Sequence, residues 1–137
     1  MAFSFYSRWY AWRRASNLAL AAYWRYQSNR WYLISSLVLQ ALLWFFAYRL
    51  YAVVGADSFV AHYNVDFGID AIGGSSRAFN IPLLGLAILL ANNLILINFS
   101  RRPHFHFLTH AFGLTTVLAQ VLGVLALMSL YLINFLA

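Results

Sequence analysis

The chain has 137 residues, of which 64% are hydrophobic and only 9% charged, and its formal net charge is +6. A soluble domain of this length carries about a quarter charged residues, whereas here the charges are nine Arg and three Asp. This composition excludes an ordinary soluble enzyme, an acidic binding module and a disordered regulator. Cysteine is absent, which excludes disulfides, thiolate metal sites and a cysteine nucleophile. We therefore predict an all-α integral membrane protein.

The first segment, residues 1–30, is a basic and aromatic arm, and eleven aromatic residues lie between Phe3 and Tyr32, in the arm and at the start of the next segment. At 100° per residue its aromatic and arginine residues fall on opposite sides, which predicts an N-terminal amphipathic helix lying in the bilayer interface. Docking of the same residues on a partner protein is the alternative, because Trp, Tyr and Arg dominate interface cores. Nucleic-acid binding is disfavoured by the apolar face and the tether to the bilayer. The residues expected to face lipid or a partner are Trp9, Trp12, Arg13, Arg14, Tyr23 and Arg25.

Three apolar segments follow, at 31–54, 81–99 and 107–136, and each is long enough to cross about 30 Å of hydrocarbon. Arg49 lies near the far end of the first span, about 27 Å of helix from Arg30. Its guanidinium can therefore reach the headgroup layer and does not disqualify the span. Nothing in the arm reads as a cleaved signal, so the first span is expected to remain as an anchor.

The arginines predict the orientation, because positive charge in short flanking segments is retained in the cytoplasm. Seven of the nine lie in the arm and in the loop between the second and third spans, whereas the loop 55–80 contains all three Asp and only Arg77. We expect the N-terminus to be cytoplasmic and the C-terminus and the loop 55–80 to lie outside. The expected location is a bacterial inner membrane.

Four amides lie in the hydrocarbon interior of the predicted spans, where an unpaired polar group costs several kcal/mol. We expect them to face one another as interhelical contacts, with Gln40, Asn93 and Gln120 at similar depths. No carboxylate lies in a span, which disfavours a proton-coupled transporter. The four residues are Gln40, Asn92, Asn93 and Gln120.

His106 and His110 open the third span and share one helical face. Contact with lipid headgroups is the first interpretation, and axial ligation of a haem or chlorophyll is the alternative. The sequence predicts no metal site, because no Cys, Glu or nearby Asp completes a ligand set. It predicts no enzyme either, because no Ser/His/Asp set assembles on one side except loosely around His62.

The outer loop 55–80 contains alternating apolar residues from 59 to 65, which predict a short extended stretch. A turn is expected at Asp66–Phe67–Gly68, and 73–76 reads as a flexible lead into the second span. We therefore predict a small compact cap on the helices.

The loop sequence His62-Tyr-Asn-Val-Asp-Phe-Gly-Ile-Asp70, followed by Gly73 and by Ile81-Pro-Leu-Leu-Gly-Leu86, has a recognisable pattern. It resembles an uncharacterised family of small three-span bacterial membrane proteins with an HYN-x-x-FGID-x-x-G loop. More distantly, it resembles the domain of unknown function found in immunity proteins against sporulation-delaying toxins. The resemblance covers residues 61–96 and implies a topology and a focal loop but no activity. The residues it brings forward are His62, Asn64, Gly68, Asp70 and Gly73.

These loop residues have two interpretations: His62 and Asn64 cap backbone groups in a tight turn, or the loop recognises a partner or peptide. For the whole chain, the sequence favours a non-catalytic accessory subunit that packs against other membrane proteins. The alternatives are an immunity or envelope-sensing protein acting through the outer loop, and a haem- or chlorophyll-holding subunit using the span-three histidines. Apart from the haem or chlorophyll of that last alternative, we expect no cofactor.

Overall fold

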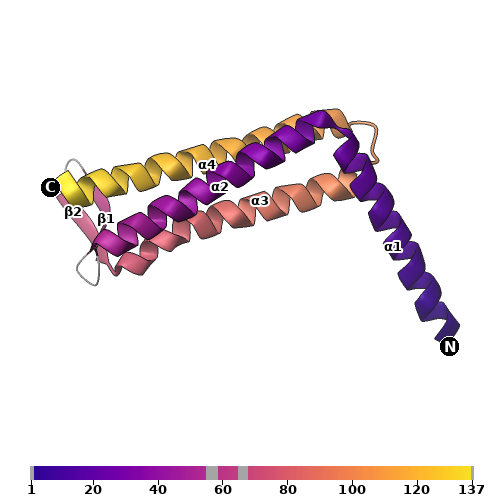
Figure 1. The fold of residues 1–137 in the computed structure, drawn as a ribbon, viewed down its shortest axis with the longest axis horizontal. Coiled ribbons are helices and arrows are strands. Elements are labelled where there is room, and N and C mark those ends of the chain that lie inside the picture. The colour runs from indigo at the N-terminus through magenta and orange to yellow at the C-terminus, as the bar shows by residue number, and fades with distance from the viewer. Residues whose placement is uncertain (1, 55–58, 65–67, 137) are drawn as a thin grey trace.

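The computed structural model describes the backbone of residues 2–54, 59–64 and 68–136, and the side chains of residues 6–54 and 74–134. Three long helices lie side by side as a bundle, and a fourth leaves one end of it at a steep angle (Figure 1). A β-hairpin lies at the opposite end. We call these two ends the arm end and the hairpin end. The elements in chain order are α1 (Ala2–Arg25), α2 (Gln27–Val54), β1 (Phe59–Asn64), β2 (Gly68–Gly73), the 3-10 helix η1 (Ser75–Phe79), α3 (Asn80–Phe99) and α4 (Phe105–Leu136).

The three bundle helices are long and apolar enough to cross a membrane: Gln27–Val54, Ser75–Phe99 (η1 with α3) and Phe105–Asn134. The prediction of three transmembrane helices is confirmed at this level. The observed helices begin one to four residues before the predicted spans. Most of their large apolar side chains face outward, which is the arrangement expected of a protein whose solvent is lipid.

One stripe of each helix is buried in the bundle. The buried residues of α2 recur at intervals of three and four, the spacing of left-handed helix packing. They include both small and polar side chains, as is usual where transmembrane helices meet. The stripe of α2 consists of Asn29, Ser36, Gln40, Leu43, Ala47 and Leu50.

Glycines bring α3 and α4 close to α2. A Cβ on Gly85 of α3 would lie 3.0 Å from Leu43 Cδ1, and one on Gly123 of α4 would lie 3.1 Å from Leu43 Cδ2. The Gly123 position also approaches Ile81 Cγ2 at 3.3 Å. Leu43, fully buried, therefore sits where all three helices meet, and Gly123 of α4 serves packing inside this chain.

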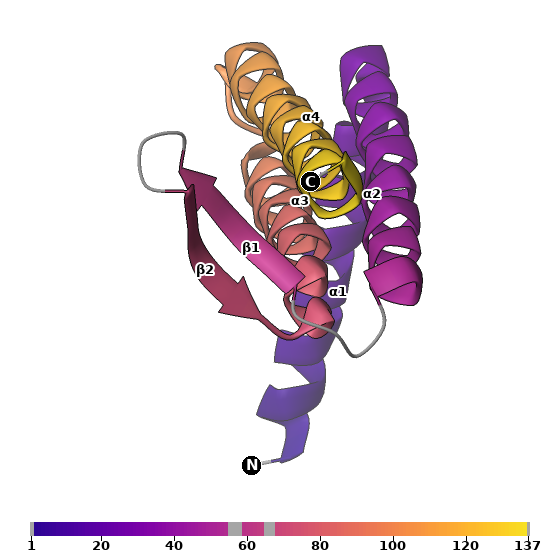
Figure 2. The same cartoon turned by 90° about the vertical axis from the view of Figure 1, so that its left-hand side faces the viewer.

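The hairpin joins α2 to η1 and crosses the near end of the bundle in Figure 2. β1 and β2 pair antiparallel, from Phe59 opposite Gly73 to Asn64 opposite Gly68, and β1 contacts α4. The predicted extended stretch is therefore strand β1, whereas the second strand was not predicted.

The lead into the second span is a 3-10 helix and not the flexible segment expected from its Gly-Gly-Ser-Ser sequence. Ser75 and Ala78 of η1 are buried. The Phe79 ring lies 6.0 Å from that of Trp44 and 5.5 Å from that of Tyr51, both on α2. These aromatic contacts fix the segment against α2.

Candidate functional site

The centre of the bundle contains a hydrogen-bonded glutamine pair. Gln40 Nε2 donates to the backbone oxygen of Pro82 at 2.8 Å, and Gln120 Nε2 donates to Gln40 Oε1 at 3.1 Å. Both side chains are buried. Gln120 Oε1 has no partner among the described residues. The pair thus links α2, α3 and α4, with one acceptor unused.

Asn92 joins α3 to α4 nearer the arm end. Its Nδ2 donates to Thr116 Oγ1 at 2.9 Å and lies 3.4 Å from the Phe112 carbonyl oxygen. The Thr116 hydroxyl in turn donates to that same carbonyl. The Asn92 amide nitrogen, the Thr116 hydroxyl and the Phe112 carbonyl are therefore hydrogen-bonded to one another inside the bundle.

Asn93 contacts the arm. The sequence placed it at a depth similar to that of Gln40 and predicted that the two amides face each other, which is wrong for Asn93. The Tyr23 hydroxyl of α1 donates to Asn93 Oδ1 at 2.5 Å. Tyr23 is buried, and desolvation raises the pKa of its phenol above the ordinary value of 10.0. The phenol is therefore protonated at neutral pH and able to donate.

Three further contacts fix the junction between α1 and the bundle. Ser100 Oγ donates to the Ala19 carbonyl oxygen at 2.8 Å, and Asn29 Nδ2 donates to the Tyr23 carbonyl oxygen at 3.0 Å. The Tyr26 ring packs edge-on against Phe105, with centroids 4.9 Å apart. The Tyr23 carbonyl lies in the last turn of α1, where carbonyl oxygens lack an i+4 partner, and it also accepts from the Tyr26 backbone N–H at 3.4 Å.

Most of the described side chains of α1 before Tyr23 are exposed. Of the predicted lipid- or partner-facing residues, only Tyr23 is buried, whereas Trp9 is 45% and Trp12 66% exposed. The Arg13 guanidinium lies 5.5 Å from the centroid of the Trp9 ring, a cation–π distance. Arg14 and Arg25 are also exposed. The arm therefore presents aromatic and cationic side chains that the bundle does not cover.

The histidines of α4 form a small cluster with α2 at the arm end. His106 Nε2 and His110 Nε2 lie 3.4 Å apart, and the Tyr32 hydroxyl lies 3.0 Å from His110 Nδ1. Tyr32 reaches this position because it passes over Gly113, where an added Cβ would lie 2.4 Å from Tyr32 Cδ2. Sequence reasoning found both histidines but missed Tyr32, whose i-to-i+78 pairing has no local sequence signal.

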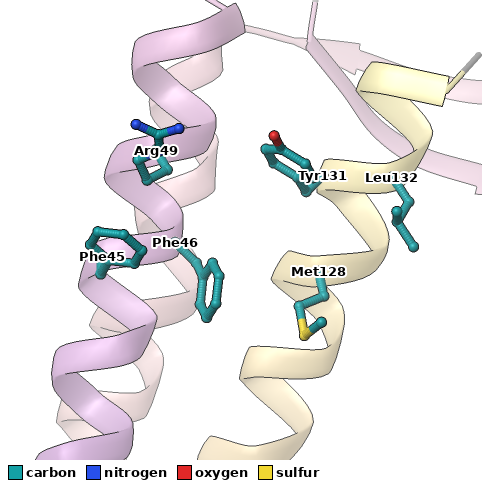
Figure 3. A pocket seen from close by; sticks show the side chains of 6 residues that line it. All are labelled: Phe45, Phe46, Arg49, Met128, Tyr131 and Leu132. Carbon is teal, nitrogen blue, oxygen red and sulfur yellow. The ribbon is translucent and has the colours of Figure 1, made fainter.

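An apolar groove of about 480 Å³ lies between α2 and α4 near the hairpin end. Phe46 of α2 and Tyr131 of α4 project toward the space between the helices, and Arg49 and Tyr131 lie nearer the hairpin than Phe46 and Met128 do (Figure 3). The Arg49 side chain is exposed, and its reach to the headgroup layer stays a prediction. The groove is lined by Phe45, Phe46, Arg49, Met128, Tyr131 and Leu132.

The hairpin brings the two halves of the loop motif together. His62 is registered with Ala71, and Asn64 with Gly68, while Asp70 and Gly73 lie farther along β2. The side chains of His62, Asn64 and Asp70 lie outside the described residues, so their contacts stay predictions.

Within the described side chains, no group of three His, Cys, Asp or Glu comes together in a way that could hold a metal ion. The sites that the geometry does assemble are the polar contacts of the bundle, the histidine cluster and the open arm. Comparisons of the chain with protein-family models, curated proteins and solved structures found no match.

Proposed function

We propose that this protein is a non-catalytic accessory subunit of a membrane assembly and that it binds a partner membrane protein through α1. One observation carries the proposal: a helix of 24 residues is anchored to the bundle at its C-terminal end, and its described aromatic side chains other than Tyr23 are exposed. Besides Trp9 and Trp12, three further aromatic side chains and two leucines of α1 are between 42% and 70% exposed: Tyr6, Tyr10, Trp24, Leu18 and Leu20.

Because α1 is anchored at its C-terminal end, it leaves the bundle in a defined direction. Tyr23, Ser100 and Asn29 make three hydrogen bonds at the junction, each of the kind that contributes about 1 kcal/mol. Because the C-terminal end of α1 is already ordered by these bonds, binding of a partner loses no further conformational entropy at that end. Exposed Trp, Tyr and Arg are the residue types that dominate the centres of protein interfaces.

The bilayer is the second partner of the same helix. As α1 leaves the bundle at its end (Figure 1), it is placed to lie along the interface. There indole and phenol rings favour headgroup depth, and arginines attract anionic lipid. We propose that one side of α1 faces lipid and another faces the partner, so that the amphipathic interfacial helix and the docking surface are one element.

The proposed orientation has the arm end in the cytoplasm and the hairpin end outside a bacterial inner membrane. Arg101 and Arg102 lie in the α3–α4 turn at the arm end, together with the arm's own arginines. All three Asp fall between residues 57 and 70 of the sequence, and Asp70 lies on β2 at the hairpin end. This distribution follows the positive-inside rule, and it makes the hairpin an external cap.

Affinity purification from native membranes tests the proposal. The full chain, tagged at its C-terminus, is extracted in mild detergent and the eluate is analysed by mass spectrometry. We expect companion subunits at constant stoichiometry, and their loss in the double variant Trp9→Ala/Trp12→Ala. Leu122→Ala/Leu125→Ala on the outward face of α4 is the matched control, since both side chains are exposed but lie away from α1.

A solitary protein in every mild detergent would contradict the proposal, as would equal loss of companions in the arm variant and the control. Circular dichroism of each purified variant verifies that the helices are retained. Photocrosslinking from position 12 in intact membranes then identifies the neighbour: a protein adduct supports docking on a subunit, whereas exclusively lipid adducts contradict it.

A second candidate function is supported by the hairpin. The two halves of the loop motif form one structural unit, because Asn64 pairs with Gly68 and Tyr63 with Ile69. Recognition of a peptide or signal by the loop would require such a unit. Under this immunity or envelope-sensing function, His62→Ala abolishes protection while insertion and abundance remain normal. Unchanged protection in that variant would remove this candidate.

A further inference from the structure

We infer that His106 and His110 form a binding site for a divalent transition-metal ion of the zinc type. Their Nε2 atoms lie 3.4 Å apart. Two imidazole nitrogens bound to one tetrahedral zinc, at about 2.0–2.1 Å each, are separated by about 3.3–3.4 Å. The distance between the two nitrogens therefore matches the one that two ligands of such an ion require.

The helix supplies this geometry. The two residues are four apart on α4, so they lie one turn from each other on the same face. Their ring centroids are 4.6 Å apart with planes inclined by 67°, so the rings converge at Nε2 and are not stacked. Both side chains are exposed in the first two turns of the helix, where an ion can reach them from water.

Tyr32 is the positioning residue. Its hydroxyl lies 3.0 Å from His110 Nδ1 and accepts a hydrogen bond when that nitrogen carries the proton. In this tautomer His110 Nε2 has its lone pair free for a metal. A hydrogen bond to the other ring nitrogen is the usual way in which a metal-binding histidine is oriented.

Gly113 allows the Tyr32 hydroxyl to reach His110, because the Tyr32 ring occupies the space that the Cβ of any other residue at position 113 would need. The cluster thus draws on two helices: α4 provides both ligands and the glycine, and α2 provides the residue that fixes one ligand. The site was not predicted from the sequence, which offered no third ligand and did not indicate that Tyr32 is near.

Two of four tetrahedral positions remain for water or an incoming ligand. Arg101 and Arg102 lie a few residues before the ligands, so the surroundings are cationic and favour an anionic group there. An open site of this kind differs from a structural zinc site, in which four protein ligands close the coordination shell.

Titration of the purified full chain with zinc chloride tests this inference, with the protein in detergent micelles and without a polyhistidine tag. We expect one ion per chain, with a dissociation constant in the micromolar range. His106→Ala and His110→Ala should each weaken binding at least about tenfold. His104→Ala is the matched control: it removes an exposed histidine of the same segment and should leave the affinity unchanged.

Cobalt provides a spectroscopic readout of geometry. The Co²⁺-loaded protein should show the intense visible absorption of a tetrahedral ion, and this absorption should disappear in His106→Ala. Tyr32→Phe keeps the ring and its packing against Gly113 but removes the hydroxyl, so it should weaken binding about tenfold at unchanged stoichiometry. If the Tyr32 hydroxyl contributed only to packing, its removal would leave the affinity for the metal ion unchanged.

Three results would overturn the inference. The first is no zinc binding by the wild-type protein, which would leave a direct His–His hydrogen bond as the reason for the short distance. The second is equal weakening by His104→Ala and His106→Ala, which indicates binding by exposed histidines in general. The third is a Soret band in protein from native membranes that is lost in His110→Ala, which assigns the cluster to a tetrapyrrole.

Discussion

Replacing Gly113 by alanine should destabilise the contact between α2 and α4 at the arm end. The new Cβ would lie 2.4 Å from Tyr32 Cδ2, 2.6 Å from Cγ and 3.0 Å from Cε2. These atoms belong to a rigid ring, which cannot yield by a small rotamer adjustment, so the whole Tyr32 side chain or the helix must move. Overpacking of this kind costs about 1–3 kcal/mol, and the ring loses its hydrogen bond to His110.

The measurement is unfolding of the helices by sodium dodecyl sulfate in mixed micelles, followed by circular dichroism. We expect Gly113→Ala to unfold at a lower detergent fraction than the wild type. Gly123→Ala is a graded control, because its new Cβ meets only methyl ends of Leu43 and Ile81 at 3.1 and 3.3 Å. Gly74→Ala should have no effect, since the nearest atom is Ser76 Oγ at 3.7 Å.

A double-mutant cycle attributes the effect to the ring. In a Tyr32→Ala background the added methyl of Gly113→Ala has space, so the second substitution should cost little or nothing. The reasoning would be refuted by a Gly113→Ala protein as stable as the wild type. Equal destabilisation in the presence and absence of the Tyr32 ring would refute it as well.

Three other outcomes follow from the polar contacts and the charge distribution. Gln40→Leu should destabilise the bundle more than Gln120→Leu, because Gln40 makes two interhelical hydrogen bonds and Gln120 only one. Each bond contributes about 0.6 kcal/mol, and unfolding in detergent measures which variant is less stable. Tyr23→Phe should loosen α1 by about 1 kcal/mol, seen as faster hydrogen exchange in α1. Because burial raises the pKa of the Tyr23 phenol, its contribution is complete below pH 10 and is lost as the pH rises through the pKa of the folded state; Tyr23→Phe abolishes this alkaline loosening. In the cysteine-free chain, a membrane-impermeant maleimide should label Ser76→Cys in intact cells and should label Ala11→Cys only after lysis.

The three spans could be predicted because their signal is local. About 20 consecutive apolar residues are required by the thickness of the bilayer alone, and the observed helices differ from the predicted spans only at their starts. Alternation from residue 59 likewise predicted strand β1. The second strand carries two glycines in six residues, and glycine is depleted in strands, so its pairing with β1 became visible only in the folded hairpin.

The polar contacts were predictable in kind but not in pairing. Burial in a bilayer requires each amide to find a partner, which is why Gln40 and Gln120 were expected to meet another helix. Depth along a span does not specify rotation about the helix axis, and this rotation separates neighbours as close as Asn92 and Asn93. The first faces Thr116 of α4, whereas the second faces Tyr23 of the arm.

The arm shows why an amphipathic pattern underdetermines the role of a helix. The pattern placed Tyr23 on the same apolar face as Trp9 and Trp12, and lipid would suffice to cover all three. The structure divides that face: Tyr23 donates a hydrogen bond inside the bundle, whereas Trp9 and Trp12 remain open. A helix that used its rings only to rest in the bilayer would not need this buried phenol–amide bond, because headgroup water satisfies a tyrosine hydroxyl equally well. The bond instead fixes where α1 leaves the bundle, and a fixed direction benefits contact with a second protein far more than contact with a fluid lipid surface.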